Sequence, residues 1–129
     1  MWNGENGKFK CYASLRIRGP GLIPDALTQK LRLEPTQTSA KLGVGSWVIS
    51  TKDSLDNLLP LETHIEELLR IIERKAELIK DLQKSATVDV FCFFASESDL
   101  GEFAIQPKIL LALGQLGLAL GVDQYFCCD

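Results

Sequence analysis

The sequence predicts a single α+β domain, a ferredoxin-like two-layer sandwich with a mostly antiparallel sheet and an inserted long helix. Segments with the period of a strand alternate along the chain with segments that have the period of a helix. Two stretches, residues 22–33 and 105–118, resemble each other as weak internal copies of a strand–helix–strand unit. The 129-residue length fits one core, so we expect one domain over residues 1–129, with residues 1–7 as a flexible terminus.

The first half of the chain contains two strand signals and one helix signal. Residues 8–18 alternate between apolar and polar side chains, which predicts a strand with one buried face. Pro24 opens a short helix, where its missing N–H costs nothing, and Pro35 ends that helix. We expect a polar loop with strand-like ends over residues 36–45 and a short strand over residues 46–51.

The second half contains the longest periodic segment. Apolar residues recur at three- and four-residue steps over residues 61–84, which predicts either one long helix or two pieces that meet near Glu73. Residues 87–96 are typical of a buried strand. A short helix over residues 107–115 and a last strand over residues 118–126 complete the prediction.

Charge and cysteine usage exclude several classes of protein. Fourteen basic against seventeen acidic residues give a net charge of −3, which opposes generic binding to nucleic acid or to an anionic membrane. The four cysteines lack metal-ligand spacing, and His64 is the only histidine, so we expect no metal and no cofactor. Without a signal peptide or a bilayer-length apolar run, the chain is expected to be cytoplasmic, with its cysteines acting as small hydrophobic residues.

A family resemblance extends from Tyr12 to Tyr125. The strings that carry it are LIPDALTQKLRLEPT, SWVIST and IQPKILLALGQLGLAL, together with a Leu-rich helix between them and a closing DQY. In these features the chain resembles the bacterial domain of unknown function numbered 4279. Residues of this chain at positions of the shared pattern are Pro35, Thr36, Lys41, Trp47 and Tyr125. The resemblance implies the fold and a bacterial origin, and it implies no activity; it also implies a break in the long helical region, where residues 70–77 contain no proline.

No catalytic motif stands out, so the sequence leans against an enzyme. His64 is expected to be exposed in the first turn of the long helix. The glycine clusters at residues 19–21 and 42–45 continue into no nucleotide-binding fingerprint and are expected to form turns. Trp47 is expected to be buried and structural, because it lies in the middle of a short strand.

The polar face of the first strand is the most informative feature. Its side chains include Lys10, Tyr12, Ser14 and Arg16. The 87–96 strand adds to this face either Asp89, Phe91 and Phe93 or Val90, Cys92 and Phe94, and the last strand adds Asp123 and Tyr125. The candidate ligand or partner face therefore comprises Tyr12, Arg16, Phe91, Phe93, Asp123 and Tyr125. We expect the long helix or a second subunit to cover it.

These observations predict a non-enzymatic binding or interaction module with a protein partner, in one version an immunity- or antitoxin-like protein. The alternative is a small enzyme or ligand-binding protein that places Tyr12, Arg16 and Asp123 around an anionic ligand. A homodimer is also expected, because Leu69, Ile71 and Leu78 widen the apolar stripe of the 61–84 helix beyond one packing face.

Overall fold

A computed structural model describes residues 9–97 and 101–126, and the expected flexible terminus at residues 1–7 lies outside this range. The described elements, in chain order, are β1 (Phe9–Pro20), α1 (Pro24–Leu31), β2 (Gln37–Lys41), β3 (Val44–Ser50), α2 (Leu61–Ile72), a 3₁₀ turn (Glu73–Lys75), α3 (Ala76–Leu82), β4 (Thr87–Ser96), α4 (Pro107–Gln115) and β5 (Ala119–Phe126).

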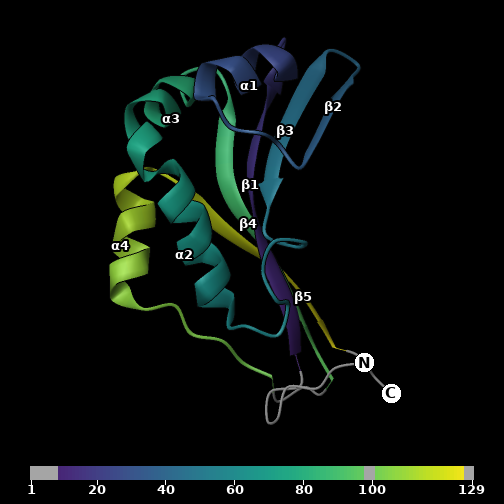
Figure 1. Cartoon of the computed structure of the whole chain (residues 1–129), viewed down its shortest axis with the longest axis vertical. Coiled ribbons are helices and arrows are strands. Elements are labelled where there is room, and N and C mark those ends of the chain that lie inside the picture. Colours follow the sequence, from purple (N-terminus) through teal and green to yellow (C-terminus); the bar gives the residue numbers. More distant parts are fainter. Residues whose placement is uncertain (1–8, 98–100, 127–129) are drawn as a thin grey trace.

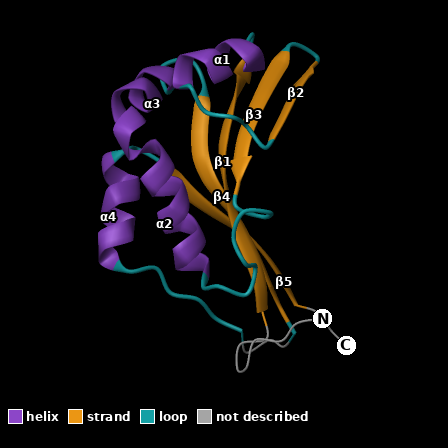
Figure 2. Ribbon diagram, in the orientation of Figure 1, coloured by secondary structure: helices purple, strands orange, loops and turns teal. Residues whose placement is uncertain are grey.

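The strands form one five-stranded sheet in the order β2-β3-β1-β4-β5. Neighbours are antiparallel except β4 and β5, which run parallel because α4 crosses over between them. The helices lie together on one side of the sheet, as Figures 1 and 2 show. The α+β class is therefore confirmed, but the sheet is mixed, whereas a mostly antiparallel one was expected.

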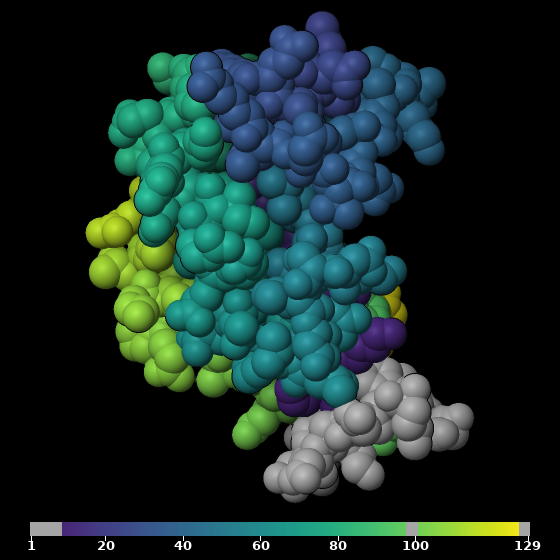
Figure 3. All heavy atoms as spheres, in the orientation of Figure 1, coloured from purple at the N-terminus to yellow at the C-terminus, as the bar shows by residue number. Residues whose placement is uncertain are grey.

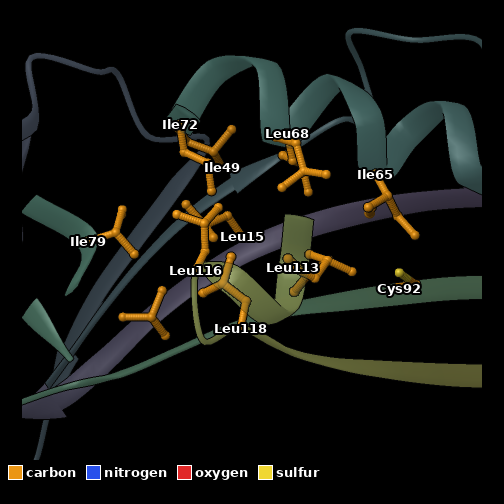
Figure 4. Packing of buried hydrophobic residues seen from close by; sticks show 14 of the residues in the cluster. Leu15, Ile49, Ile65, Leu68, Ile72, Ile79, Cys92, Leu113, Leu116 and Leu118 are labelled. Atoms are coloured by element: carbon orange, nitrogen blue, oxygen red, sulfur yellow. The ribbon is translucent and has the colours of Figure 1, made fainter. Parts of the chain in front are cut away.

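The core lies between the sheet and the helix layer. Period-two alternation in β1 turns Cys11, Ala13, Leu15 and Ile17 toward the helices, and each is fully buried. Residues from α2, α4 and the segment that follows α4 close over them, including Ile65, Leu68, Ile72, Leu113 and Leu116 (Figure 4). In the space-filling view, α1, α2, α3 and α4 form a continuous layer (Figure 3). One face of the sheet is thus buried beneath the helices.

The long helical region consists of two helices, which was one of the two expected alternatives. The 3₁₀ turn separates α2 from α3 at Glu73, and no proline is needed because the tighter turn itself ends the α-helical pattern. Both Ile72 before the break and Ile79 after it are buried. The break therefore lets each helix direct its own apolar side toward the core.

Residues 36–45, expected to form a polar loop with strand-like ends, contain the strand β2 and the start of β3, and only the turn between them is a loop. β2 pairs with β3 through a tight turn in which Leu42 and Gly43 both have positive φ, at 54° and 80°. Four of the five side chains of β2 are exposed, which is possible because β2 is an edge strand.

Trp47 in β3 is fully buried, as expected, and its Nε1–H donates a hydrogen bond to the hydroxyl of Thr28 at 3.0 Å.

Candidate functional site

The face of the sheet opposite the helices is the candidate site. Among the described residues, no helix packs on this face, and the long helical region, one of the two expected covers, lies on the other side (Figure 1). The register places Tyr12 opposite Phe93 and Arg16 opposite Asp89. On the other side of β4, Phe93 lies beside Asp123 of β5. We refer to this surface as the open face.

The alternation of β4 decides which of its side chains join the open face. Val90, Cys92 and Phe94 are buried against the helices, so Asp89, Phe91 and Phe93 point the other way. The structure therefore brings all six expected residues onto one surface. Their role in binding stays a prediction.

Three aromatic rings form a row across β1, β4 and β5. The ring centroids of Tyr12 and Phe93 are 5.1 Å apart with an interplanar angle of 17°, and those of Phe93 and Tyr125 are 5.4 Å apart. The nearly parallel rings of Tyr12 and Phe93 overlap face to face, because coplanar rings lying flat on the sheet would collide at their edges, and the Tyr125 ring is tilted by 39° against Phe93. The rings therefore stand on the sheet. They present edges and tyrosine hydroxyls, rather than open ring faces, to a partner.

A lysine that the sequence analysis missed extends this row. The Lys52 ammonium lies 5.7 Å from the centroid of the Tyr12 ring, close enough for a cation–π contact. Lys52 follows β3 in a turn region, and strand periodicity gives no signal for a side chain there. We call Lys52, Tyr12, Phe93 and Tyr125 the aromatic row.

A second cluster lies beside the aromatic row. Arg16 makes two 2.9 Å hydrogen bonds to the carboxylate of Asp89. Its guanidinium carbon also lies 4.2 Å from the centroid of the Phe91 ring. Phe91 in turn covers Gly121, where an added Cβ would meet the ring at 3.0 Å. Arg16 is thus held by an ion pair and a ring in one orientation.

Tyr125 and Asp123 form a further polar cluster on β5, at the edge of the sheet. The Tyr125 hydroxyl donates a 2.8 Å hydrogen bond to Asp123. This hydrogen bond to the carboxylate raises the pKa of the Tyr125 phenol above its ordinary value. Tyr125 therefore stays protonated at neutral pH, and it is 48% exposed.

The open face is positively charged although the whole chain is negative. Its strands and the turn after β3 contribute the cations Lys10, Arg16, Arg18, Lys41 and Lys52, which outnumber the carboxylates Asp89 and Asp123. Both carboxylates already have partners within the face. The excess positive charge is therefore available to an acidic partner.

His64 does not have the exposed position that the sequence suggested. It is fully buried, with Nδ1 2.6 Å from the Thr51 hydroxyl and Nε2 3.1 Å from the backbone carbonyl of Asp56. The reason is that the buried side of α2 includes the His64 position next to Ile65. Burial lowers the pKa of His64, which favours a neutral ring with Nε2–H donating to Asp56.

The buried cysteines are not reactive groups. Burial raises the pKa of Cys11 and of Cys92 to about 12, and both are free thiols. Cys127 and Cys128 lie outside the described residues. Within residues 9–97 and 101–126, no cluster of three or more potential metal ligands occurs. None of the helices found there is long and apolar enough to cross a membrane.

The apolar residues that suggested self-association through the helix have partners in the same chain. Leu69 is buried in the core, and α2 contacts α4 as well as the sheet. Ile71 and Leu78 are half-buried against the same core. The wide apolar stripe thus reflects a second helix packing beside α2, and the homodimer stays a prediction that needs another surface.

Comparison with known proteins gives one result. The model of a family described as a domain of unknown function (DUF4279) matches residues 9–127. No curated protein and no solved structure matches the chain. Because the match spans nearly all of the chain, from the start of β1 to just past β5, it confirms the resemblance seen in the sequence. The chain belongs to the DUF4279 family.

Proposed function

We propose that this domain is a non-catalytic binding module whose open face docks an acidic surface of a protein partner. The observation that carries the proposal is that the aromatic row lies on a face with more cations than carboxylates. The two carboxylates of this face, Asp89 and Asp123, already have partners. Tyrosine and arginine are the residues that contribute most to protein–protein binding energy, and rigid side chains lose little entropy on binding. Arg16 and Tyr12 are held by their neighbours in this way.

The orientation of the rings favours a protein over a nucleic acid. Single-stranded nucleic acid binds to sheet faces by stacking bases on exposed ring faces. In the aromatic row, Phe93 has Tyr12 on one side and Tyr125 on the other, so its faces are occupied. Ring edges carry partial positive charge and suit carboxylates and carbonyl oxygens instead.

An enzyme or a small-ligand site is the alternative, and the face supports it less. Its polar groups are bound to one another, with Arg16 on Asp89 and Tyr125 on Asp123, rather than converging on an empty centre. Two pockets of about 240 and 350 Å³ are lined by residues of other regions, around Ile23 and around Phe103 respectively.

The ferredoxin-like topology, the cytoplasmic location and the bacterial role are also part of this proposal. The order β2-β3-β1-β4, with helices between β1 and β2 and between β3 and β4, supports a ferredoxin-like unit to which α4 and β5 are added. The free thiols Cys11 and Cys92 support a reducing, cytoplasmic location. A bacterial immunity- or antitoxin-like role would suit a small module that recognises one acidic partner.

Site-specific photo-crosslinking in the native host tests the proposal. A photoreactive phenylalanine analogue at position 12 is expected to capture a discrete acidic protein. The same analogue at Arg74, an exposed position in the helix layer, is the control and is expected to capture none. Charge reversal by Lys52→Glu should abolish the capture at position 12. Equal capture at both positions, or capture that survives Lys52→Glu, would refute this use of the open face.

A further inference from the structure

The two edges of the sheet differ in how they are protected against pairing with another strand. Edge β2 has five residues, is polar and carries Lys41. Edge β5 has eight residues, contains neither proline nor a cation, and ends in Tyr125 and Phe126, which are 48% and 51% exposed. Short length, lysine and proline are the usual devices that keep an edge strand from pairing. β5 lacks all three.

We infer that β5 pairs with β5 of a second copy of this chain, antiparallel about a two-fold axis, to form one continuous sheet. Among the described residues, β5 has β4 as its only neighbour, so its outer backbone groups face away from the sheet. Self-pairing about a two-fold axis satisfies both edges with one contact. This inference is independent of the partner proposed for the open face.

The side chains of β5 select the register. When Val122 lies on the two-fold axis, Tyr125 lies opposite Ala119 of the second copy and Asp123 lies opposite Gly121. On the open face, large side chains then meet small ones, and the two Asp123 carboxylates do not oppose each other. The register centred on Asp123 places these carboxylates side by side, which is unfavourable. The strand is thus complementary to itself in shape and in charge.

The helix next to this edge, α4, also favours a second copy of this chain as the partner. α4 contacts β5, and two of its apolar side chains, Leu110 and Leu111, are 49% and 62% exposed. A two-fold axis perpendicular to the sheet keeps both helix layers on one side and brings the two copies of α4 to the same junction. A partner that added only a single peptide strand would supply no second helix there.

Light scattering at micromolar concentration is the first test. The expected mass is twice the 14.3 kDa of one chain. Ala119→Lys gives β5 the lysine that keeps other edge strands from pairing and should raise the dissociation constant by roughly tenfold or more. The matched control is Ala40→Lys, the same change at an exposed alanine of the opposite edge, and it should leave the dimer unchanged. A monomeric parent protein, or a dimer that Ala40→Lys weakens as much as Ala119→Lys does, overturns the inference.

Crosslinking gives a readout that does not depend on weakening the dimer. With Cys127 and Cys128 replaced by serine, the pair Ala119→Cys and Tyr125→Cys should be joined between copies by a short thiol crosslinker. Ala119→Cys alone should not crosslink, because the two copies of residue 119 are six positions apart in this register, roughly 20 Å. Crosslinking that is equal in both proteins, or absent from both, overturns the register.

Discussion

Replacement of Thr51 by valine tests whether one buried hydroxyl holds β1, β3 and α2 together. Thr51 is 1% exposed, and its hydroxyl accepts a hydrogen bond from the backbone N–H of Ala13 at 3.1 Å. The same oxygen lies 2.6 Å from Nδ1 of His64. Valine has nearly the same volume, so Thr51→Val leaves no cavity but removes the partner of two buried polar groups.

The expected loss follows from those two groups. A buried donor or acceptor left without a partner costs about 1–3 kcal/mol, so with two such groups the variant should lose about 2–6 kcal/mol of unfolding free energy. The control is Thr51→Ser, which keeps the hydroxyl and removes one methyl group, for a loss of about 1 kcal/mol. Hydrophobicity alone predicts the opposite order, because valine is the more apolar residue at a buried position.

Urea unfolding followed by circular dichroism measures the difference. The midpoint for Thr51→Val should lie below that for Thr51→Ser, with the same slope for both. If Thr51→Val is as stable as Thr51→Ser, or more stable, the two hydrogen bonds do not stabilise the fold and the reasoning fails.

Three further predictions concern stability. Because burial lowers the pKa of His64, the unfolded chain binds more protons than the folded one, so the contribution of His64 to stability should be complete above a pH of about 6.5 and fall below it. Urea midpoints measured from pH 7.5 to 5 should show this fall in the parent protein and not in His64→Gln. An identical fall in both proteins would assign it to other groups. Trp47→Ala should cost about 3–5 kcal/mol in thermal unfolding, and Trp47→Phe less, whereas melting like the parent would contradict its burial. Gly45→Ala places a Cβ against the Leu22 carbonyl oxygen and should cost about 3 kcal/mol or more, while Gly114→Ala, in open space on α4, should stabilise by up to about 1 kcal/mol. Equal melting temperatures for the two variants would show that the backbone yields freely at Gly45.

The elements with strong periodicity could be predicted from the sequence. The strand over residues 87–96 and the helix over residues 107–115 have the expected boundaries, because a continuous apolar run and a proline at the first turn are local signals. β2 lies in a segment expected to be a polar loop with strand-like ends, since an edge strand exposed on both sides has no apolar alternation to detect. β2 forms because it pairs with β3, and the local sequence pattern does not show that contact.

The candidate site was predictable in its members but not in its arrangement. Alternation in β4 allowed two sets of residues, and only the packing of Phe94 against the helices decides between them. The burial of His64 was missed because its partner Thr51 lies in a different element. Lys52 was missed for the same reason, since its contact with Tyr12 joins the turn after β3 to strand β1. Contacts between elements leave no periodic trace in a sequence.

The position of β1 in the sheet has a consequence for biosynthesis. β1 pairs with both β3 and β4, and Arg16 bonds to Asp89, 73 residues further along the chain. While the chain emerges from the ribosome, β1 has only β3 as a neighbour until the residues up to Ser96 have been made. Contacts of such long sequence separation form slowly. We therefore expect the nascent chain to present a strand edge of β1 to chaperones until β4 has been made and has paired with it.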